Sequence, residues 1–290
     1  MLLSIITINY NNLEGLKQTA LSVLEQTCQS FEWIVVDGDS TDGSKEYLQA
    51  ILRNDTLIVS EPDKGIYDAQ NKGVGLSHGE YCLFLNSGDS FANIEATAIC
   101  LHQLEKNPAC DFLRFAAILT KNNKTCHIYT PPHEITGIFL YESFIAHQAT
   151  LIRRDLLVRV PYDISYKIAA DADFFCKCFF REKVQDAYCD IPLTYFDCSG
   201  VSSTEVAKTE EERKRLLLST LGELIYHDYR RFSVGRTFLE HCVTRLQRNA
   251  FFKVIAEIAI LPIYACHGVI SIFSNTRYYW RKLIQLSKHK

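Results

Sequence analysis

An acid closely follows an apolar run where residues 81–85 lead into Asn86-Ser87-Gly88-Asp89. The apolar residues predict a buried strand, and the polar residues place a carboxylate near its carboxyl end. In an open α/β sheet, ligands bind beyond the carboxyl ends of the strands. A carboxylate there suits a hard divalent cation, and such a cation suits phosphates. The same four residues are also typical of an ordinary turn, so the stretch alone leaves both interpretations open.

Polar residues also follow two other predicted strands, as Asn9-Tyr10-Asn11 and as Asp37-Gly38-Asp39. If the strands are parallel, all three polar clusters meet at one edge of the sheet, which indicates a site. Asp37 comes directly after Val36, so we expect it to be partly buried at the strand end. A carboxylate there can accept the imide N–H of uracil, which favours a uridine nucleotide. Capping of the following helix or an Asx-turn remains an equal alternative for Asp37.

Residues 60–73 predict a helix that begins near Asp63 or Gly65. Asp68 and Asn71 are three residues apart and would share one face of it. A helix start with free N–H groups and a nearby lysine is a natural anion site. The alternative is a solvated amphipathic helix.

The elements that must position these residues alternate along the first 120 residues. Strands are predicted at 2–8, 31–36, 57–59 and 81–85, and helices after residue 12, at 44–52 and at 66–76. This alternation predicts parallel βαβ units and a doubly wound α/β sheet. The pattern is mixed from about residue 108, with strands at 112–119, 126–129 and 190–196 and a helix at 170–180. After residue 203 the sequence is helical and basic, which predicts a domain boundary near 204.

The composition is that of a globular protein, with 47% hydrophobic and 22% charged residues among 290. The eleven cysteines are scattered and form no Cys-x-x-Cys pair. The first residues lack a basic leader and a cleavage site, so they predict a strand and not a signal peptide. Free thiols without a leader predict a reducing, cytoplasmic location.

The small net charge of −3 conceals an asymmetry. Residues 1–204 carry 16 Lys and Arg against 26 Asp and Glu, whereas residues 205–290 carry 15 against 8. The apolar stretch 251–273 is interrupted by Lys253, Glu257, Pro262 and His267, so it does not predict a membrane-spanning helix. With arginines on both sides it resembles an interfacial segment that binds the anionic inner face of the cell membrane. A helical subdomain that packs on the core or on a second subunit, in a homo-oligomer, is the alternative.

Several stretches together resemble family 2 glycosyltransferases, and specifically a branch that includes bacterial exopolysaccharide and colanic-acid-type enzymes. In the first half, they are residues 4–11, 35–43, 63–73 and 79–89. The resemblance implies a GT-A fold: a mixed, mainly parallel Rossmann-like sheet flanked by helices. It also implies a nucleotide-sugar donor, a divalent metal (Mn²⁺ or Mg²⁺) and inversion at the anomeric carbon. The implied catalytic domain is 1–204, with a nucleotide-sugar half (1–107) and an acceptor half (108–204), followed by a helical basic extension (205–290).

Position by position, the resemblance assigns Asp89 to the metal and a larger group to the sugar donor. That group is Thr7, Asn9, Tyr10, Asp37, Asp63, Lys64, Asp68, Asn71, Asn86, Ser87, Gly88, Gly200 and Ser202. The chain departs from the family where Asn86 and Gly88 replace expected acids, which implies either modest metal affinity or an ion held mainly by the diphosphate. Gln70 is a second departure, because many relatives have Arg there.

The acceptor side rests on two further stretches, 144–148 and 170–174. The first resembles a family His-Gln element, so His147 and Gln148 are assigned to the acceptor or the metal. The second resembles the motif with the catalytic base, so Asp171 is assigned as the base and Asp173 as its support. Capping of the helix that starts there is the alternative role for Asp171, and a structural role is the alternative for His147.

These assignments predict an inverting, metal-dependent glycosyltransferase. Its sugar donor would be a nucleotide-sugar, UDP-linked by preference. The acceptor would be a saccharide or a polyprenyl-diphosphate-linked saccharide in surface polysaccharide synthesis, and no nucleic acid is implied. One alternative is a nucleotidyltransferase with a related nucleotide site, although its glycine-rich basic loop is missing after the first strand. Another alternative is a catalytically silent protein that binds a sugar nucleotide or a polysaccharide.

Overall fold

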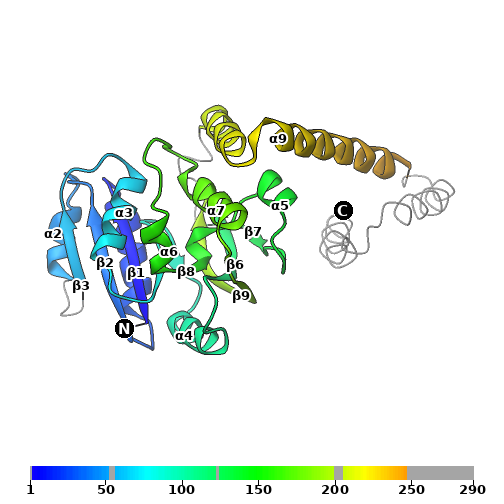
Figure 1. The fold of residues 1–290 in the computed structure, drawn as a ribbon. Coiled ribbons are helices and arrows are strands. Elements are labelled where there is room, and N and C mark those ends of the chain that lie inside the picture. The colour runs from blue at the N-terminus through cyan, green and yellow to red at the C-terminus, as the bar shows by residue number, and fades with distance from the viewer. Residues whose placement is uncertain (1, 52–55, 122–123, 199–204, 247–290) are drawn as a thin grey trace. The chain divides into compact units, whose positions relative to one another are not determined.

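The computed structural model describes residues 2–51, 56–121, 124–198 and 205–246. The strands are β1 (Leu3–Asn9), β2 (Phe31–Asp37), β3 (Thr56–Ser60), β4 (Tyr81–Phe84), β5 (Ser90–Phe91), β6 (Phe112–Lys121), β7 (Lys124–Tyr129), β8 (Thr150–Arg153) and β9 (Asp186–Asp197). The helices are α1 (Leu13–Leu24), α2 (Ser44–Ala50), α3 (Ile66–Leu76), α4 (Ala96–Lys106), α5 (Gly137–Glu142), the 3₁₀ turn η1 (His147–Ala149), α6 (Arg154–Arg159), α7 (Ala170–Arg181) and α9 (Val206–Leu246). Figure 1 shows how they are arranged.

The strands of the described residues form one mixed sheet in the order β3-β2-β1-β4-β8-β6-β9-β5, with β7 paired to β6. The first four strands in that order are parallel, and β8 runs antiparallel to both β4 and β6. This is the predicted α/β, GT-A-like architecture. The register places Asn9 beside Asp37, and Asp37 beside Ser60. Three polar residues that are distant in sequence therefore lie side by side at one edge of the sheet.

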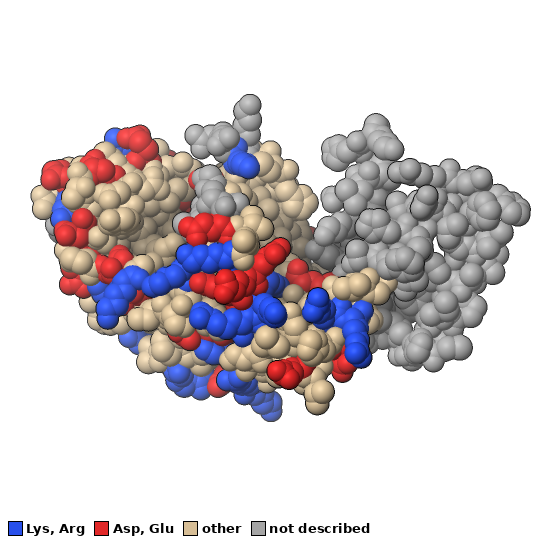
Figure 2. Space-filling model, turned by 90° about the horizontal axis from the view of Figure 1, so that it is seen from above, with Lys and Arg blue, Asp and Glu red and all other residues tan. Residues whose placement is uncertain are grey.

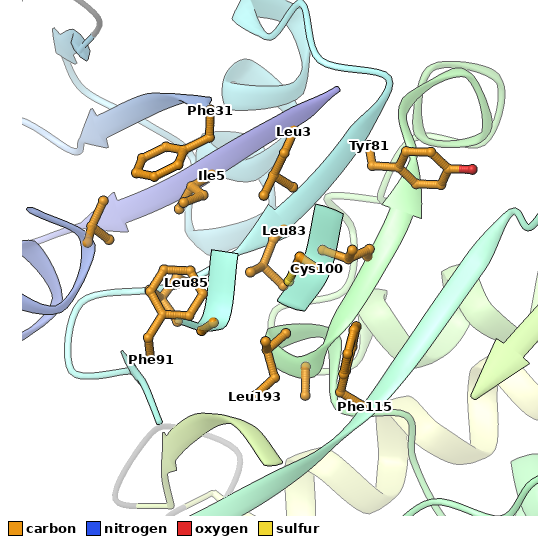
Figure 3. Close-up of a cluster of buried hydrophobic side chains, with 14 of the residues drawn as sticks. Leu3, Ile5, Phe31, Tyr81, Leu83, Leu85, Phe91, Cys100, Phe115 and Leu193 are labelled. Atoms are coloured by element: carbon orange, nitrogen blue, oxygen red, sulfur yellow. The ribbon is translucent and has the colours of Figure 1, made fainter. Parts of the chain in front are cut away.

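Alternate side chains of the parallel strands pack on opposite faces of the sheet. Ile5, Val35 and Leu83 belong to a core cluster with α1 and α4, part of which is shown in Figure 3. On the other face, Gly73 of α3 packs closely on Ile6. A strand that is buried on both faces must be apolar throughout, which explains the continuous apolar runs in the sequence.

Contacts divide the described residues into two compact units, one within 2–133 and 143–222 and the other made of residues 134–142 and the part of α9 after residue 222. The division falls at Gly222, where α9 is kinked and the backbone has φ 74° and ψ 164°. The first turns of α9 therefore belong to the unit that contains the sheet, whereas the sequence placed the boundary near 204. In the second unit, the ring of Tyr141 in α5 packs against Tyr226 and Tyr229 of α9.

Basic and acidic side chains interleave across the middle of the surface seen in Figure 2. None of the helices in the described residues has the length and apolar content needed to cross a membrane. The predicted interfacial stretch 251–273 lies outside the described residues.

Candidate active site

Asp37 is the centre of a polar cluster at the carboxyl ends of β1, β2 and β3. Its carboxylate accepts hydrogen bonds from the side chains of Asn9 (2.8 Å), Ser40 (2.6 Å) and Ser60 (2.7 Å), and from the backbone N–H of Ser40 (3.0 Å). Burial opposes ionisation, but the bonds from Ser40, Ser60 and Asn9 outweigh it and hold the pKa of Asp37 below its usual value. Asp37 is therefore ionised at neutral pH.

The four acceptor positions of the Asp37 carboxylate are all taken by protein groups, and its side chain is fully buried. A uracil N–H can bind it only if one of the serine hydroxyls turns away. Tyr10 is an exposed aromatic residue at this edge, with about two-thirds of its surface accessible. A Cβ on Gly38 would lie 2.5 Å from Asp63 Oδ2 and 3.1 Å from Tyr10 Cδ2. The glycine therefore allows Tyr10 and Asp63 to lie together beside Asp37.

The Asn86–Asp89 turn is tied to β1 and α1 by its backbone and by Ser87. The Ser87 hydroxyl donates to Asn9 Oδ1 at 2.8 Å, which joins the turn to the Asp37 cluster. Thr19 of α1 donates to the carbonyl of Asp89 (2.6 Å) and accepts from the N–H of Gly88 (3.0 Å). Gly88 has φ +106°, a conformation that strains any residue with a side chain. This backbone conformation favours glycine at position 88.

Asp89 is buried but poorly provided with hydrogen-bond partners. The backbone N–H of Asp197 donates to its Oδ1 at 3.2 Å. Burial raises the pKa of Asp89 to about 7, and the bonds from the backbone of Asp197 and Asn86 only partly offset this. The nearby Asp197 carboxylate raises the pKa further, whereas His147 lowers it. Such a carboxylate suits a cation, because a positive charge would favour its ionised form.

The residues of the described ranges fit a metal ion only in part. They contain no group of three or more His, Cys, Asp or Glu side chains arranged to hold one. Asp89 and the neighbouring Asp197 supply hard oxygen ligands, which match Mn²⁺ or Mg²⁺.

Asp171, in the first turn of α7, is held by side chains from two other elements. His147 Nδ1 lies 3.0 Å from Asp171 Oδ2, and the Tyr67 hydroxyl of α3 lies 3.0 Å from Oδ1. His147 Nε2 is 3.4 Å from Asn86 Nδ2, and Asn86 Oδ1 accepts from Gln70 at 3.3 Å. A chain of polar contacts therefore joins the Asn86–Asp89 turn to Asp171.

Asp171 remains ionised although it is partly buried. Burial would raise its pKa, but the hydrogen bond and charge of His147, with the bonds from Ala172 N–H and Tyr67, hold the pKa below its usual value. Asp171 is therefore an anion at neutral pH. Its partner His147 also contacts Asn86, in the turn that carries Asp89. An ionised carboxylate in that place can accept a proton.

Other predicted site residues have structural partners. Thr7 accepts from the indole N–H of Trp33 (3.0 Å) in the core. Asn71 makes two bonds with the backbone of Tyr162 (2.8 and 3.0 Å). Asp173 is buried and pairs with Lys177 at 2.6 Å. Gln148 is a buried residue of η1. The structure does not bring Thr7, Asn71 or Asp173 into the contacts that join Asp37, Asp89 and Asp171.

At the start of α3, two of the N–H groups that the sequence left open for an anion are bound by carboxylates of the protein itself. Asp63 accepts from the N–H of Gly65 (2.7 Å), and Asp68 accepts from the N–H of Lys64 (3.0 Å). Asp68 also lies 3.7 Å from Lys72. Gly200 and Ser202, assigned to a loop near the diphosphate, lie outside the described residues.

Sequence reasoning did not assign Ser40, Ser60 or Tyr67 to the site. Ser40 lies within the quoted stretch 35–43, and Tyr67 within 63–73, so both were available as polar members of those motifs. Ser60 follows an apolar strand, as Asp37 does, which is the signal that could have identified it.

The sheet order and the polar strand ends define a GT-A-like α/β protein, and comparison with known proteins gives its family. The model of glycosyl transferase family 2 matches residues 4–160, and the chain belongs to this family. It is therefore a glycosyltransferase.

Two relatives illustrate the range of similarity. A "PGL/p-HBAD biosynthesis glycosyltransferase" of Mycobacterium bovis is 31% identical over 204 residues, covering 69% of this chain and 77% of the relative. The "Putative teichuronic acid biosynthesis glycosyltransferase TuaG" of Bacillus subtilis is 28% identical over 138 residues, covering 47% and 55%.

Two solved structures share the fold at low sequence identity. Residues 1–349 of TarS from S. aureus, in complex with UDP-GlcNAc, give a TM-score of 0.60 at 18% identity, covering 76% of this chain and 67% of that one. The mannosyltransferase PcManGT from Pyrobaculum calidifontis, in complex with GDP-Man and Mn²⁺, gives 0.59 at 13% identity, covering 98% and 80%. These likenesses concern the fold.

Proposed function

We propose that the protein transfers a sugar, with inversion, from a UDP-sugar to a hydroxyl of a saccharide or lipid-linked saccharide acceptor in surface polysaccharide synthesis. The observation that carries this proposal is the ionised Asp171, joined through His147 and Asn86 to the turn that carries Asp89. The names of the mycobacterial relative and of TuaG support a role in cell-surface glycans.

The sugar donor would bind at the carboxyl ends of β1, β2 and β4. Tyr10 is exposed there and offers an aromatic face to a base, while Asp37 fixes the surrounding hydroxyl and amide groups. The nucleotide-sugar complexes of TarS and PcManGT support this type of ligand. Asp89, with Asp197 nearby, would hold a divalent cation, which when bound neutralises charge on the diphosphate.

Asp171 would act as the base. In an inverting transfer, one group removes the proton of the acceptor hydroxyl as its oxygen attacks opposite the departing diphosphate. His147 and Tyr67 bind different oxygens of Asp171, so they fix the orientation of its carboxylate. Asp171 then takes the proton, and the diphosphate leaves with the electrons of the broken glycosidic bond.

The test is Asp171→Asn, assayed with UDP-, GDP- and dTDP-sugars with and without manganese. General base catalysis contributes about 10²- to 10⁴-fold, so we expect transfer to fall by about that factor while the Kd for UDP changes less than about twofold. Asp155→Asn, which changes an exposed acid of α6, is the matched control. Loss of UDP binding in Asp171→Asn would contradict the base role. Silence of the unmodified protein with every sugar donor, despite nucleotide binding, would instead favour a binding protein without activity.

The basic end of the chain would bring the enzyme to an anionic membrane. Beyond residue 229, eleven Lys and Arg face only Glu240 and Glu257. Replacing Arg277, Arg281 and Lys282 by Gln should reduce cosedimentation with phosphatidylglycerol vesicles, since each basic residue near such a surface contributes about 1 kcal/mol. Equal cosedimentation of both proteins would contradict this role, and phosphatidylcholine vesicles provide the control.

A further inference from the structure

Glu212 is a buried carboxylate in the first part of α9, a segment that the sequence assigned to the extension beyond the catalytic domain. Its side chain is only 8% exposed. The residues on either side of it in the helix are more exposed, so the burial is specific to this position. A buried carboxylate needs hydrogen-bond donors to offset the loss of water.

Three consecutive backbone N–H groups supply those donors. Lys167 donates to Glu212 Oε1 at 2.8 Å, and Ile168 and Ala169 donate to Oε2 at 2.9 and 3.0 Å. Ala169 is the N-cap residue of α7, and it has no side chain that could cap the helix. The first N–H groups of a helix have no partners within the helix and favour a negative charge. Glu212 binds the N–H of the N-cap residue and of the two residues before it, so another helix places a carboxylate at the start of α7.

The segment that Glu212 binds is also the support of Asp171. The carbonyl of Ile168 accepts from the Tyr67 hydroxyl, which also lies 3.0 Å from Asp171 Oδ1. The single hydroxyl hydrogen of Tyr67 is thus shared between this carbonyl and the carboxylate. A shift of Ile168 would therefore change both the start of α7 and the partner of Asp171.

A second residue of α9 binds the same loop. The guanidinium of Arg215 lies 4.0 Å from the centre of the Tyr166 ring and donates to the carbonyl of Ser165 (3.2 Å). These contacts are more exposed than those of Glu212, so we expect them to contribute less. The loop 165–169 is therefore held by α9 along its length, with the charged bonds at its Asp171 end.

We propose that Glu212 is a positioning residue for Asp171, acting through the backbone of residues 167–169 and through Tyr67. The inference rests on the proposed role of Asp171 as the base. It assigns part of the catalytic arrangement to α9, outside the residues matched by the family model. Glu212 itself need not touch either substrate.

The test is Glu212→Gln in the full chain, compared with two controls. The amide keeps the shape of the side chain but turns an N–H₂ group toward backbone donors. Displacement of a catalytic group by about 1 Å can cost about 10²-fold in rate, so we expect kcat to fall by about 10- to 100-fold. The KM for the sugar donor and the Kd for UDP should change less than about twofold, because the Asp37 cluster is not affected.

The two controls separate the positioning role from stability. Glu211→Gln changes an exposed neighbour and should leave kcat unchanged. Leu216→Ala removes a buried side chain of the same helix, so it should lower the Tm at least as much as Glu212→Gln and yet retain kcat well below the Tm. If Glu212→Gln does not fold, Glu212→Asp provides the test. It keeps the carboxylate but moves it away from the N–H groups of residues 167–169, so kcat should fall to a value between those of the wild type and of an inactive variant.

Two results would overturn the inference alone: normal kcat in Glu212→Gln while Asp171→Asn is inactive, or equal loss of kcat in Leu216→Ala. Absence of transfer by the unmodified enzyme would overturn the proposed function, and this inference with it.

Discussion

Asp37 and Asp89 are both buried acids beside the carboxyl ends of strands that flank β1, yet their charges are controlled in opposite directions. Asp37 follows β2 and receives four hydrogen bonds, so its pKa is lowered. Asp89 follows β4, receives a bond from the backbone of Asp197, and has its pKa raised to about 7 by burial. The number of donors around each acid, and not burial alone, decides whether it is ionised.

This difference indicates which of the two carboxylates has its charge stabilised by the protein alone and which would gain from a bound ligand. Asp37 already has partners for its lone pairs, so its main work is to hold Asn9, Ser40 and Ser60 in place. Asp89 receives hydrogen bonds from the backbone of Asp197 and Asn86, but they do not offset its burial, so a bound cation would favour its ionised form. Asp37 therefore has a structural role in the site, and Asp89 is the acid that we expect to bind a ligand.

The largest expected effect comes from Asp37→Asn. The amide group would face donors that now bind a carboxylate, and hydrogen bonds to charged groups contribute about 1.5–3 kcal/mol each. We expect the free energy of unfolding to fall by about 3 kcal/mol, measured in urea. Asp39→Asn, at the exposed neighbouring acid, is the control and should change it little. A stable Asp37→Asn protein would show that the cluster does not depend on the charge.

Replacing Asp89 by Asn should instead raise the free energy of unfolding. In metal-free protein at pH 8, Asp89→Asn removes a charge that burial disfavours, so stability should rise by on the order of 2 kcal/mol. The rise in Tm on adding manganese should disappear, since the amide is a weaker ligand. Destabilisation of the metal-free protein would contradict the comparison, and a retained manganese effect would exclude Asp89 as a ligand.

The difference in the free energy of unfolding between the wild type and Asp89→Asn should depend on pH. The folded pKa of Asp89, about 7, lies above its ordinary value, so the neutral acid stabilises the folded state. This contribution is complete below pH about 4 and is lost as the pH rises through about 7. Urea unfolding of both metal-free proteins between pH 5 and 8 measures it. A gap that does not change over this range would show that Asp89 does not titrate there.

Much of the site at the sheet edge could be predicted because it depends on local patterns. Apolar runs that end in polar residues gave the strand ends, and the parallel register then placed Asn9, Asp37 and Ser60 together. The helix predicted at 66–76 has the same bounds as α3. Thr7 was assigned to the sugar donor, but alternation along β1 points it into the core at Trp33.

The rest of the site depends on contacts that no local pattern encodes. Tyr67 and Asp171 are 104 positions apart, and Glu212 binds backbone groups 43 to 45 positions away. Backbone N–H groups are present at nearly every residue, so the sequence does not show which of them a buried carboxylate will bind. The short strands β5 and β8 were not predicted either, because pairing with neighbours supports them more than their own composition does.

The kink at Gly222 also has a practical consequence for protein engineering. A fragment that ends at residue 204 would expose the surface on which the first turns of α9 pack and would remove the carboxylate bound to residues 167–169. A fragment that ends at Gly222, 18 residues later, would keep Glu212 and the first turns of α9, but it would remove Tyr226 and Tyr229, against which Tyr141 of α5 packs. A truncation that preserves these α5 contacts therefore has to keep the residues of α9 that follow the kink.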